Sequence, residues 1–335
     1  MAEIPNIKKR GEIKRIGVLT SGGDAPGMNP AIRAVTRSGI HKGLEVFGVM
    51  NGYQGMIEGN IVPLTSDDVS GILQKGGTIL KTARSKDFRT EEGRAKAYKN
   101  LMKLEIDALV VIGGDGSFMG ASIFSKEYDI PVVGIPGTID NDMYGTEYTL
   151  GYDTAMNTVI DAVDKIKDTA SSHGRIFFVE VMGREAGLLA LSSGIACGAE
   201  AIIIPEADEG DKDLQKYLKN YKKKKNSGIV MVAEGDKAGG ALKLAERVTS
   251  DYPDLDVRVS ILGHMQRGGN PTGTDRVIAT QMGVAAVEAL LDDQKSIMIG
   301  YVNSKITHVP FNKTVKANRP IDHDLLDIQK ALNKW

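Results

Sequence analysis

Cysteine is almost absent from this sequence of 335 residues, in which Cys197 stands alone. A single cysteine excludes an intrachain disulfide framework and a cluster of zinc-binding thiolates, and it predicts a reducing, cytoplasmic compartment. No apolar run approaches the roughly 18 residues that span a membrane, and the amino terminus lacks the hydrophobic stretch of a secretory signal. The 42 basic and 43 acidic residues balance, which argues against a general nucleic-acid binder.

Glycine, by contrast, is abundant, at 39 of 335 residues or about 12%, against about 7% in a typical protein. The glycines occur in short clusters between apolar runs, without a collagen-like period or a low-complexity tract. This distribution predicts turns in which the backbone closely approaches another group. Charged residues make up 25% and hydrophobic residues 41%, as in ordinary folded domains, and the length predicts two domains or one large one.

Nine continuous runs rich in Val, Ile and Leu predict strands that are buried on both faces of a parallel sheet. They are residues 16–20, 46–50, 108–113, 131–136, 176–182, 201–205, 228–234, 258–263 and 296–300. Helical patterns occupy 28–42, 90–104 and 152–170, with Asn29 and Thr90 as the expected N-caps of the first two. Strands that alternate with helices predict an α/β fold with mainly parallel sheets flanked by helices.

The residues 15–27 and 175–187 both follow the order strand, turn, helix. This similarity predicts two related α/β domains with a boundary near Gly151. Any two strand–helix units share part of such a pattern, so the similarity alone is weak evidence that the two domains are related.

Two turns that follow predicted strands are rich in glycine. The turn 21–27, Ser-Gly-Gly-Asp-Ala-Pro-Gly, is either a cradle for an anion or simply a tight turn. It matches neither the dinucleotide fingerprint nor the Walker A loop, which disfavours an oxidoreductase. The turn 113–117 embeds Asp115 among glycines. Its carboxylate would suit Mg²⁺ beside phosphates, and the alternative is a helix N-cap formed by Asp115 or Ser117.

A third turn, 136–142, carries Asp140 and Asp142 two positions apart. In an extended loop their side chains would point in opposite directions, so one can face a substrate hydroxyl while the other supports a metal or an orienting group. The alternative is an ordinary loop built on Asx turns. All three turns are expected at the carboxyl edge of one sheet, where open α/β sheets bind ligands.

Basic residues accompany the other predicted strands. Arg184 follows one strand, and His264 and Arg267 follow another, three positions apart beside two glycines. A His and an Arg in this setting are suited to gripping a phosphate, because Arg offers a bidentate fork. Arg175 and Arg258 instead precede strands, so they are either surface charges or parts of a site completed by a neighbouring subunit.

Two further features allow more than one interpretation. Glu234 ends a predicted strand, where it can bind sugar hydroxyls or cap the following turn. Lysines 222–225 close a helix, as a solvated end that interacts with the helix dipole or as part of an effector site for an anion.

Five ordered stretches together resemble the bacterial ATP-dependent 6-phosphofructokinase family. They are GVLTSGGDAPGMN, ALVVIGGDGS, GIPGTIDND, VEVMGREAG and LGHMQRGG, and the resemblance extends from about Lys14 to the mid-320s. It implies the phosphofructokinase fold and a homotetramer whose active sites are shared between subunits. The expected domains are an ATP-binding one, 1–150 plus 266–315, and a fructose 6-phosphate-binding one, 151–265 plus 316–335.

The resemblance implies transfer of the γ-phosphoryl group of Mg-ATP to O1 of fructose 6-phosphate, with Asp140 as general base and Asp115 holding Mg²⁺. The other residues expected to take part in catalysis are Arg84, Thr138, Asp142 and Arg184. Those expected to bind ATP are Gly23, Tyr53, Arg84, Ser85, Arg89, Gly114, Asp115, Gly116 and Ser117. Those expected to bind the sugar phosphate are Thr138, Ile139, Asp140, Arg175, Met182, Gly183, Arg184, Glu234, Arg258, His264, Met265, Gln266 and Arg267.

An effector site for ADP or phosphoenolpyruvate is also implied, between subunits. The matching residues are Arg33, Arg37, Lys167, Gly198, Glu200, Lys223 and Lys225. Three positions depart from the family pattern, because Ser66 and Lys167 stand where arginine is common and Ser227 replaces a histidine. Lysine offers no bidentate fork, which puts regulation by these effectors in doubt.

Gly116 and Gly137 bear on the choice of phosphoryl donor. Pyrophosphate-using relatives tend to carry Asp and Lys at these positions, so two glycines leave space for a nucleotide and favour ATP. The alternatives are a pyrophosphate-dependent phosphofructokinase, an enzyme similar to NAD kinase and a non-catalytic sugar-phosphate sensor. An enzyme similar to NAD kinase would leave the stretches PGTIDND and GHMQRGG without a role. A sensor needs no catalytic base, so Asp115, Asp140 and Arg184 argue against it.

Overall fold

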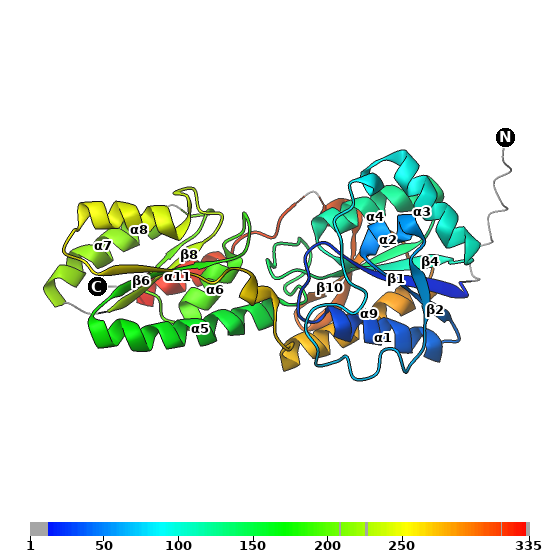
Figure 1. Cartoon of the computed structure of the whole chain (residues 1–335), viewed down its shortest axis with the longest axis horizontal. Helices are drawn as coiled ribbons and strands as arrows, with labels where there is room; N and C mark the ends of the chain where they lie inside the picture. The colour runs from blue at the N-terminus through cyan, green and yellow to red at the C-terminus, as the bar shows by residue number, and fades with distance from the viewer. Residues whose placement is uncertain (1–12, 208, 225–226, 316, 333–335) are drawn as a thin grey trace. The chain divides into compact units, whose positions relative to one another are not determined.

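The computed structural model describes residues 13–207, 209–224, 227–315 and 317–332, which form two compact units (Figure 1). The first unit holds 13–138, 143–150 and 271–318, and the second holds 139–142, 151–270 and 319–332. The expected division differs from this one at 139–142 and 266–270, which belong to the second unit, and at 317–318, which belong to the first. In the second unit Asp140 forms an ion pair with Arg184.

The first unit is built on a seven-stranded sheet with the order β11-β10-β5-β4-β1-β2-β3. Its strands are β1 (Arg15–Ser21), β2 (Glu45–Val49), β3 (Ile61–Leu64), β4 (Ala108–Gly113), β5 (Val132–Pro136), β10 (Ile297–Val302) and β11 (Lys305–Pro310). The inner pairs are parallel, and the two outer pairs, β2 with β3 and β10 with β11, are antiparallel. The predicted parallel strands are confirmed, and β3 and β11 are additional edge strands.

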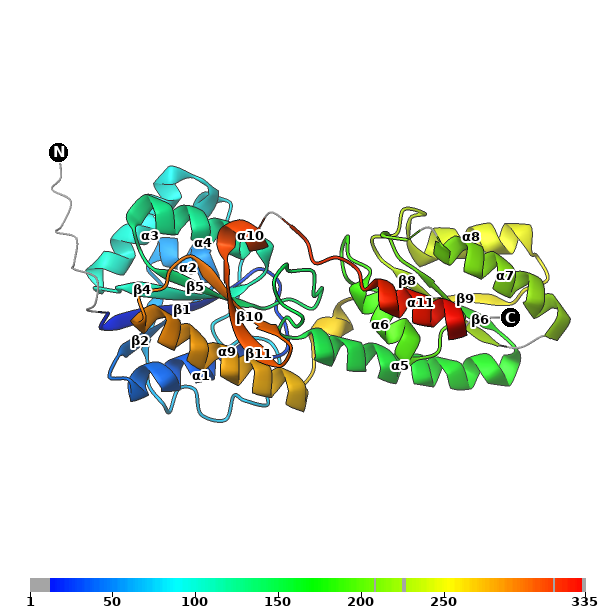
Figure 2. The same ribbon diagram turned by 180° about the vertical axis from the view of Figure 1, so that it is seen from behind.

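Helices cover both faces of this sheet, with α1 and α9 on one face and α2, α3 and α4 on the other (Figures 1 and 2). They are α1 (Met28–His41), α2 (Gly52–Glu58), α3 (Glu91–Lys103), α4 (Asp115–Tyr128), α9 (Gly273–Leu291) and α10 (Phe311–Thr314), with a 3₁₀ turn η1 (Asp87–Arg89). Under α4, the buried rings of Phe118, Phe124 and Phe311 pack with strand residues such as Val111. This core holds the carboxyl end of β4 in place.

The two expected helix caps have different outcomes. Thr90 caps α3 as predicted, since its hydroxyl oxygen accepts a hydrogen bond from the Gly93 N–H at 3.1 Å. The Asn29 prediction is wrong, because Gly27 in a left-handed conformation (φ 110°) is the N-cap of α1. Asn29 lies within the helix, where its amide accepts from the Ile79 N–H at 2.7 Å and donates to the Lys75 carbonyl oxygen at 3.1 Å.

The second unit has a four-stranded, wholly parallel sheet with the order β7-β8-β6-β9. Its strands are β6 (Ile176–Val181), β7 (Ala201–Ile203), β8 (Gly228–Ala233) and β9 (Val257–Ile261). Helices α5, α6 and α11 cover one face, and α7 and α8 cover the other (Figure 2). They are α5 (Tyr152–His173), α6 (Leu188–Ala196), α7 (Glu209–Lys224), α8 (Gly240–Asp251) and α11 (His323–Leu332), with a 3₁₀ turn η2 (Gly263–Arg267).

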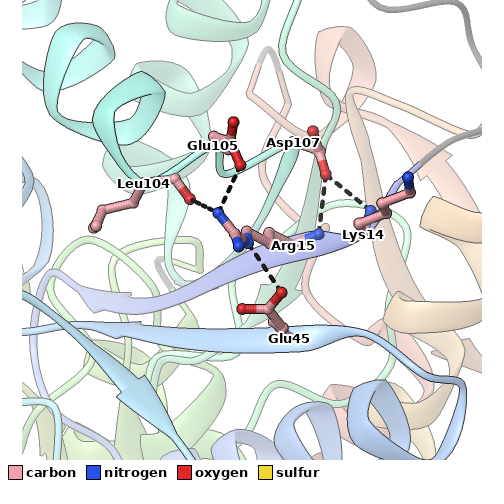
Figure 3. A network of polar contacts seen from close by, with 6 residues as sticks. All are labelled: Lys14, Arg15, Glu45, Leu104, Glu105 and Asp107. Carbon is pink, nitrogen blue, oxygen red and sulfur yellow. Dashed lines mark hydrogen bonds and ion pairs between the residues drawn. The ribbon is translucent and has the colours of Figure 1, made fainter.

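Charged side chains tie together the amino ends of the first sheet (Figure 3). Arg15 Nε donates to Glu45 on β2 at 3.1 Å, and Nη1 donates to Glu105 at 2.8 Å and to the Leu104 carbonyl oxygen at 3.1 Å. Asp107, just before β4, accepts from the backbone N–H of Arg15 at 2.9 Å. Among the helices of the described residues, none is both long enough and apolar enough to cross a bilayer.

Candidate active site

The first two glycine-rich turns lie side by side at the carboxyl edge of the seven-stranded sheet. Ser21, at the end of β1, is the register partner of Gly113, at the end of β4. A Cβ on Gly113 would lie only 2.5 Å from the Ser21 carbonyl oxygen and 2.6 Å from Ser117 Oγ. Only glycine therefore permits this close approach. Gly22 is left-handed (φ 91°) and exposed, so the first turn presents backbone at the same edge.

Asp115 and Gly116 form the start of α4 at this edge. Asp115 is half-buried in the first position of the helix, where the positive end of the helix dipole favours anions. A Cβ on the exposed Gly116 would meet no atom within 4 Å, so the space beside it is open. Gly114 is the N-cap residue of α4, so no side chain caps the helix. Neither Asp115 nor Ser117 is therefore the N-cap, the alternative that the sequence allowed.

The segment 84–89 carries the expected nucleotide-binding arginines. Both Arg84 and Arg89 are exposed. Ser85 is held from within, because its hydroxyl donates to Gln54 Oε1 at 2.8 Å and accepts from the Phe88 N–H at 3.1 Å. The cations therefore extend from a backbone segment that other side chains fix in place.

Tyr53 has a different environment from the one that contact with a nucleotide base would give it. Its ring is buried and stacks on Phe88, with ring centroids 4.0 Å apart, and its hydroxyl donates to the Ser117 carbonyl oxygen at 2.6 Å. Burial raises the pKa of the Tyr53 hydroxyl above its usual range. In this structure Tyr53 supports the start of α4 from the core.

The third turn changes units between Thr138 and Ile139. Gly137 is packed, since a Cβ there would lie 3.1 Å from both Ile112 and Met28. A side chain at this position would point into the core, which corrects the expectation that Gly137 leaves space for a nucleotide. Asn141 is left-handed (φ 53°), so 140–142 is not extended and the predicted opposite directions of the two aspartates lose their basis.

Asp140 lies with the loop after β6 in the second unit. The carboxylate is 1% exposed, and its Oδ2 is 3.3 Å from Nε of Arg184, a residue that is 60% exposed. Arg184 itself is left-handed, with φ 53°. The N–H groups of Arg184 and Gly183 both donate to Glu234 Oε1, at 2.8 and 3.3 Å. Glu234, at the end of β8, therefore fixes the turn that carries Arg184.

The 3₁₀ turn η2 completes this edge of the smaller sheet. Gln266 is fully buried, accepts from the Met182 N–H at 3.1 Å and donates to the Gly263 carbonyl oxygen at 3.0 Å. It holds η2 against the loop after β6. His264 and Met265 are exposed, Arg267 is half-buried, and all three belong to the same short turn.

Arg175 and Arg258 lie at the opposite, amino edge of the smaller sheet. Arg175 immediately precedes β6, whereas Arg258 is the second residue of β9 rather than preceding it. Both pair with Asp256, through Arg175 Nε at 2.8 Å and Arg258 Nη1 at 2.6 Å. The hydrogen bond from Arg175 holds the pKa of Asp256 below its usual range. The two arginines thus lie away from the turns of their own unit.

The expected effector residues divide between the units. Arg33 and Arg37 lie on α1, and Arg37 donates to the Ser66 carbonyl oxygen at 3.3 Å. Lys167 and Glu200 line a pocket of about 280 Å³ in the second unit. The neighbouring Gly198 is left-handed.

Within this pocket, both side chains already have partners. Lys167 donates to the Cys197 carbonyl oxygen, and Glu200 accepts from the Ile229 N–H at 2.6 Å. Burial raises the pKa of Glu200. Lys225 lies outside the described residues, as does the side chain of Lys223.

The supporting residues of these turns escaped the sequence analysis. Gln54 accepts a hydrogen bond from Ser85, and Arg94 donates one to the Phe88 carbonyl oxygen. Thr82 supports the first turn, because its hydroxyl donates to the Gly22 carbonyl oxygen at 2.8 Å. Arg94 is the one with a usable signal, since it is a charged residue on the apolar side of α3.

Comparison with known proteins identifies the family. The phosphofructokinase family model matches residues 15–290. A Bacteroides thetaiotaomicron protein named ATP-dependent 6-phosphofructokinase 2 is 57% identical over 324 residues, covering 96% of this chain and 99% of its own. A Thermus thermophilus protein named ATP-dependent 6-phosphofructokinase 1 is 51% identical over 321 residues, covering 96% and 99%.

Solved structures share the fold. Phosphofructokinase from Saccharomyces cerevisiae matches with a TM-score of 0.83 and 40% identity, over 96% of this chain but only 47% of the yeast chain. A pyrophosphate-dependent phosphofructokinase from Marinobacter aquaeolei matches with a TM-score of 0.82 at 20% identity, over 96% and 91%, which shows the fold alone. The resemblance in the sequence and the expected fold class are confirmed, and the chain belongs to the phosphofructokinase family.

Proposed function

We propose that this protein is an ATP-dependent 6-phosphofructokinase, which transfers the γ-phosphoryl group of ATP to O1 of fructose 6-phosphate. The observation that carries the proposal is the 57% identity, over 96% of the chain, to a relative that bears this name. In this proposal the first unit binds the nucleotide and the second binds the sugar phosphate.

The nucleotide half would use the first two glycine-rich turns. Backbone N–H groups at the start of α4 and in the turn after β1 can bind phosphate oxygens, and the helix dipole favours the negative charge. The open space beside Gly116 supports a donor that extends beyond two phosphates. Arg84 and Arg89 would supply cations from the neighbouring segment, and Gly23, Gly114 and Ser117 would line the phosphates.

The start of α4 also suits a hard divalent cation that is shared with phosphate oxygens. Within the described residues, no group of three or more His, Cys, Asp or Glu side chains could hold a metal ion. Mg²⁺ in kinases commonly takes only one or two carboxylates plus phosphate oxygens, so the lone Asp115 fits it. Bound there, Mg²⁺ would neutralise charge on the transferring phosphoryl group.

The sugar-phosphate half would use the carboxyl edge of the smaller sheet. His264 and Arg267 on η2 would grip the 6-phosphate, and the turn fixed by Glu234 would present Arg184 to the substrate. Asp140 would accept the proton of the 1-hydroxyl as the oxygen attacks phosphorus. The ion pair with Arg184 supports this role, because it orients the buried carboxylate of Asp140.

The remaining predicted residues would act between subunits. Arg175 and Arg258 would complete the sugar-phosphate site of a neighbouring subunit in a homotetramer, which their position at the amino edge of the sheet supports. Lys167 and Glu200 would belong to an effector site for ADP or phosphoenolpyruvate. The pocket that they line in the second unit supports binding of a small ligand there.

A coupled assay for fructose 1,6-bisphosphate tests the function directly. The purified protein is given fructose 6-phosphate and Mg²⁺ with either ATP or pyrophosphate, each with and without ADP as effector. We expect turnover with ATP and little with pyrophosphate. Turnover with pyrophosphate but not with ATP would overturn the donor assignment. Inactivity with both donors would overturn the proposed function.

A further inference from the structure

A buried arginine in the first unit has bonds that reach the proposed nucleotide segment. Arg94, in the first turn of α3, is 6% exposed. It forms a bidentate pair with Glu127 on α4, with Nε to Oε2 at 2.5 Å and Nη2 to Oε1 at 2.7 Å. This pairing raises the pKa of Arg94 further, so the guanidinium stays charged.

The third nitrogen of the guanidinium bonds to backbone. Arg94 Nη1 donates to the carbonyl oxygens of Phe88 at 3.1 Å and of Arg89 at 2.9 Å. Two successive peptide groups are therefore held by one planar cation that is itself fixed by a carboxylate. A planar fork loses little freedom for each hydrogen bond that it makes, which suits a positioning role.

The segment held in this way has a buried side and an exposed side. Ser85 and Phe88 face inward, and the Phe88 ring stacks on Tyr53. Arg84 and Arg89 are exposed. Arg94 thus fixes the backbone of Phe88 and Arg89 from the buried side of a segment whose exposed side carries two cations.

The same network reaches both ends of α4. The Tyr53 hydroxyl bonds to the Ser117 carbonyl oxygen in the first turn, and Glu127 lies in the last. A Cβ on Gly120, between them, would lie 3.3 Å from the rings of both Phe88 and Tyr53, which is tighter than ordinary contact. The segment 85–89 and the helix that begins at Asp115 are therefore fixed with respect to one another.

We propose that Arg94 is a positioning residue for the nucleotide, which acts by holding the carbonyl oxygens of Phe88 and Arg89. The proposal rests on the ATP-dependent function proposed above. Binding of a nucleotide then requires little further ordering of 84–89, and lower ordering cost means higher affinity. The sugar phosphate gains nothing from this network, so the two substrates should respond differently to its loss.

The test compares Arg94→Lys with Arg15→Lys in the full-length enzyme. Arg15 is a matched control, because it also bonds to carboxylates and a backbone carbonyl but at the opposite end of the sheet. For Arg94→Lys, we expect the KM for Mg-ATP to rise at least tenfold, while kcat and the KM for fructose 6-phosphate change less than twofold. For Arg15→Lys, all three constants should stay within twofold of the wild type.

The other outcomes would overturn either the role of Arg94 or the function on which it rests. A lowered Tm with an unchanged KM for Mg-ATP, or equal rises in both KM values, would reduce Arg94 to a purely structural residue. Should Arg94→Lys fail to fold, Glu127→Gln replaces it, and a KM for Mg-ATP within twofold of the wild type would overturn the proposal. A wild-type enzyme that does not phosphorylate fructose 6-phosphate with ATP would instead refute the function on which the proposal rests.

Discussion

The two ends of the seven-stranded sheet use charge in opposite ways. At the amino ends, Arg15 pairs with Glu45 and Glu105, and Asp107 binds the backbone of the neighbouring strand (Figure 3). At the carboxyl ends, glycines bring turns together, and the exposed cations Arg84 and Arg89 face solvent. Charges that satisfy one another hold strands in register, whereas exposed cations beside a helix N-terminus are available to an anion.

The smaller sheet also carries paired arginines at its amino ends, but the proposed function gives these arginines a role. Its carboxyl ends carry Arg184, Glu234 and η2, and its amino ends carry Arg175 and Arg258, which both pair with Asp256. The two arginines are satisfied like Arg15, yet the proposed function gives them a role in a neighbouring subunit. If that proposal holds, pairing with Asp256 at the amino edge does not prevent the two arginines from binding substrate in another subunit.

The largest expected effect comes from the carboxyl side, at Asp140. We expect Asp140→Ser to lower kcat by about 10²–10⁴-fold, the usual contribution of a positioned general base. Binding of fructose 6-phosphate should change little, because Arg184 is 60% exposed and tolerates the loss of its partner. Steady-state kinetics and equilibrium binding of the sugar phosphate measure the two effects. A variant with near-native kcat would show that another group takes the proton.

Gly116→Asp should separate binding from stability at the same side of the sheet. The space beside Gly116 is open, and an acidic residue in the first turn of a helix is favourable by about 0.3–1 kcal/mol. The new carboxylate would repel the phosphates of ATP, so we expect the KM for ATP to rise at least tenfold with no loss of stability. Kinetics and chemical denaturation of one preparation give both numbers. A drop in stability would mean that the site around Gly116 is packed.

The sequence predicted the interior strands because they are buried on both faces. Runs such as 108–113 are apolar throughout, and the structure places β4 there with the same bounds. The strands β3 and β11 were missed because they are edge strands, where half of the side chains face solvent and proline is tolerated. Their sequences, IVPL and KITHVP, contain no continuous apolar run.

In the candidate site, the glycine-rich turns can be recognised from the sequence, whereas the residues that hold these turns in place are much harder to recognise. The approach of Gly113 to Ser21 needs glycine, so the motif itself marks the turn. Arg94 carries a weaker signal, as a charged residue on the apolar side of α3, but its partner Glu127 lies 33 positions away and only the packing of α3 beside α4 brings the two together. Gly137 shows the converse, since a glycine in a functional motif proved to be required by the core.

A change at the amino side should affect stability alone. Asp107→Ala removes a carboxylate that accepts from the Lys14 and Arg15 N–H groups at 2.8 and 2.9 Å. We expect the free energy of unfolding to fall by about 1–2 kcal/mol, with kcat and both KM values unchanged. Urea denaturation, followed by kinetics on the same sample, measures this. A changed KM for ATP would break the proposed separation between the two ends of the sheet.

The smallest expected effect is at Gly137, at the carboxyl side but facing the core. A Cβ there would lie 3.1 Å from Ile112 and Met28, whose side chains can shift by a few tenths of an ångström. We therefore expect Gly137→Ala to lower the free energy of unfolding by about 1 kcal/mol, as overpacking does, while the KM for ATP stays within twofold. Denaturation and steady-state kinetics, with Gly116→Ala as the matched control in open space, distinguish the two glycines. If Gly137→Ala raised the KM for ATP more than Gly116→Ala, the division between a glycine required by packing and one required by the ligand would fail.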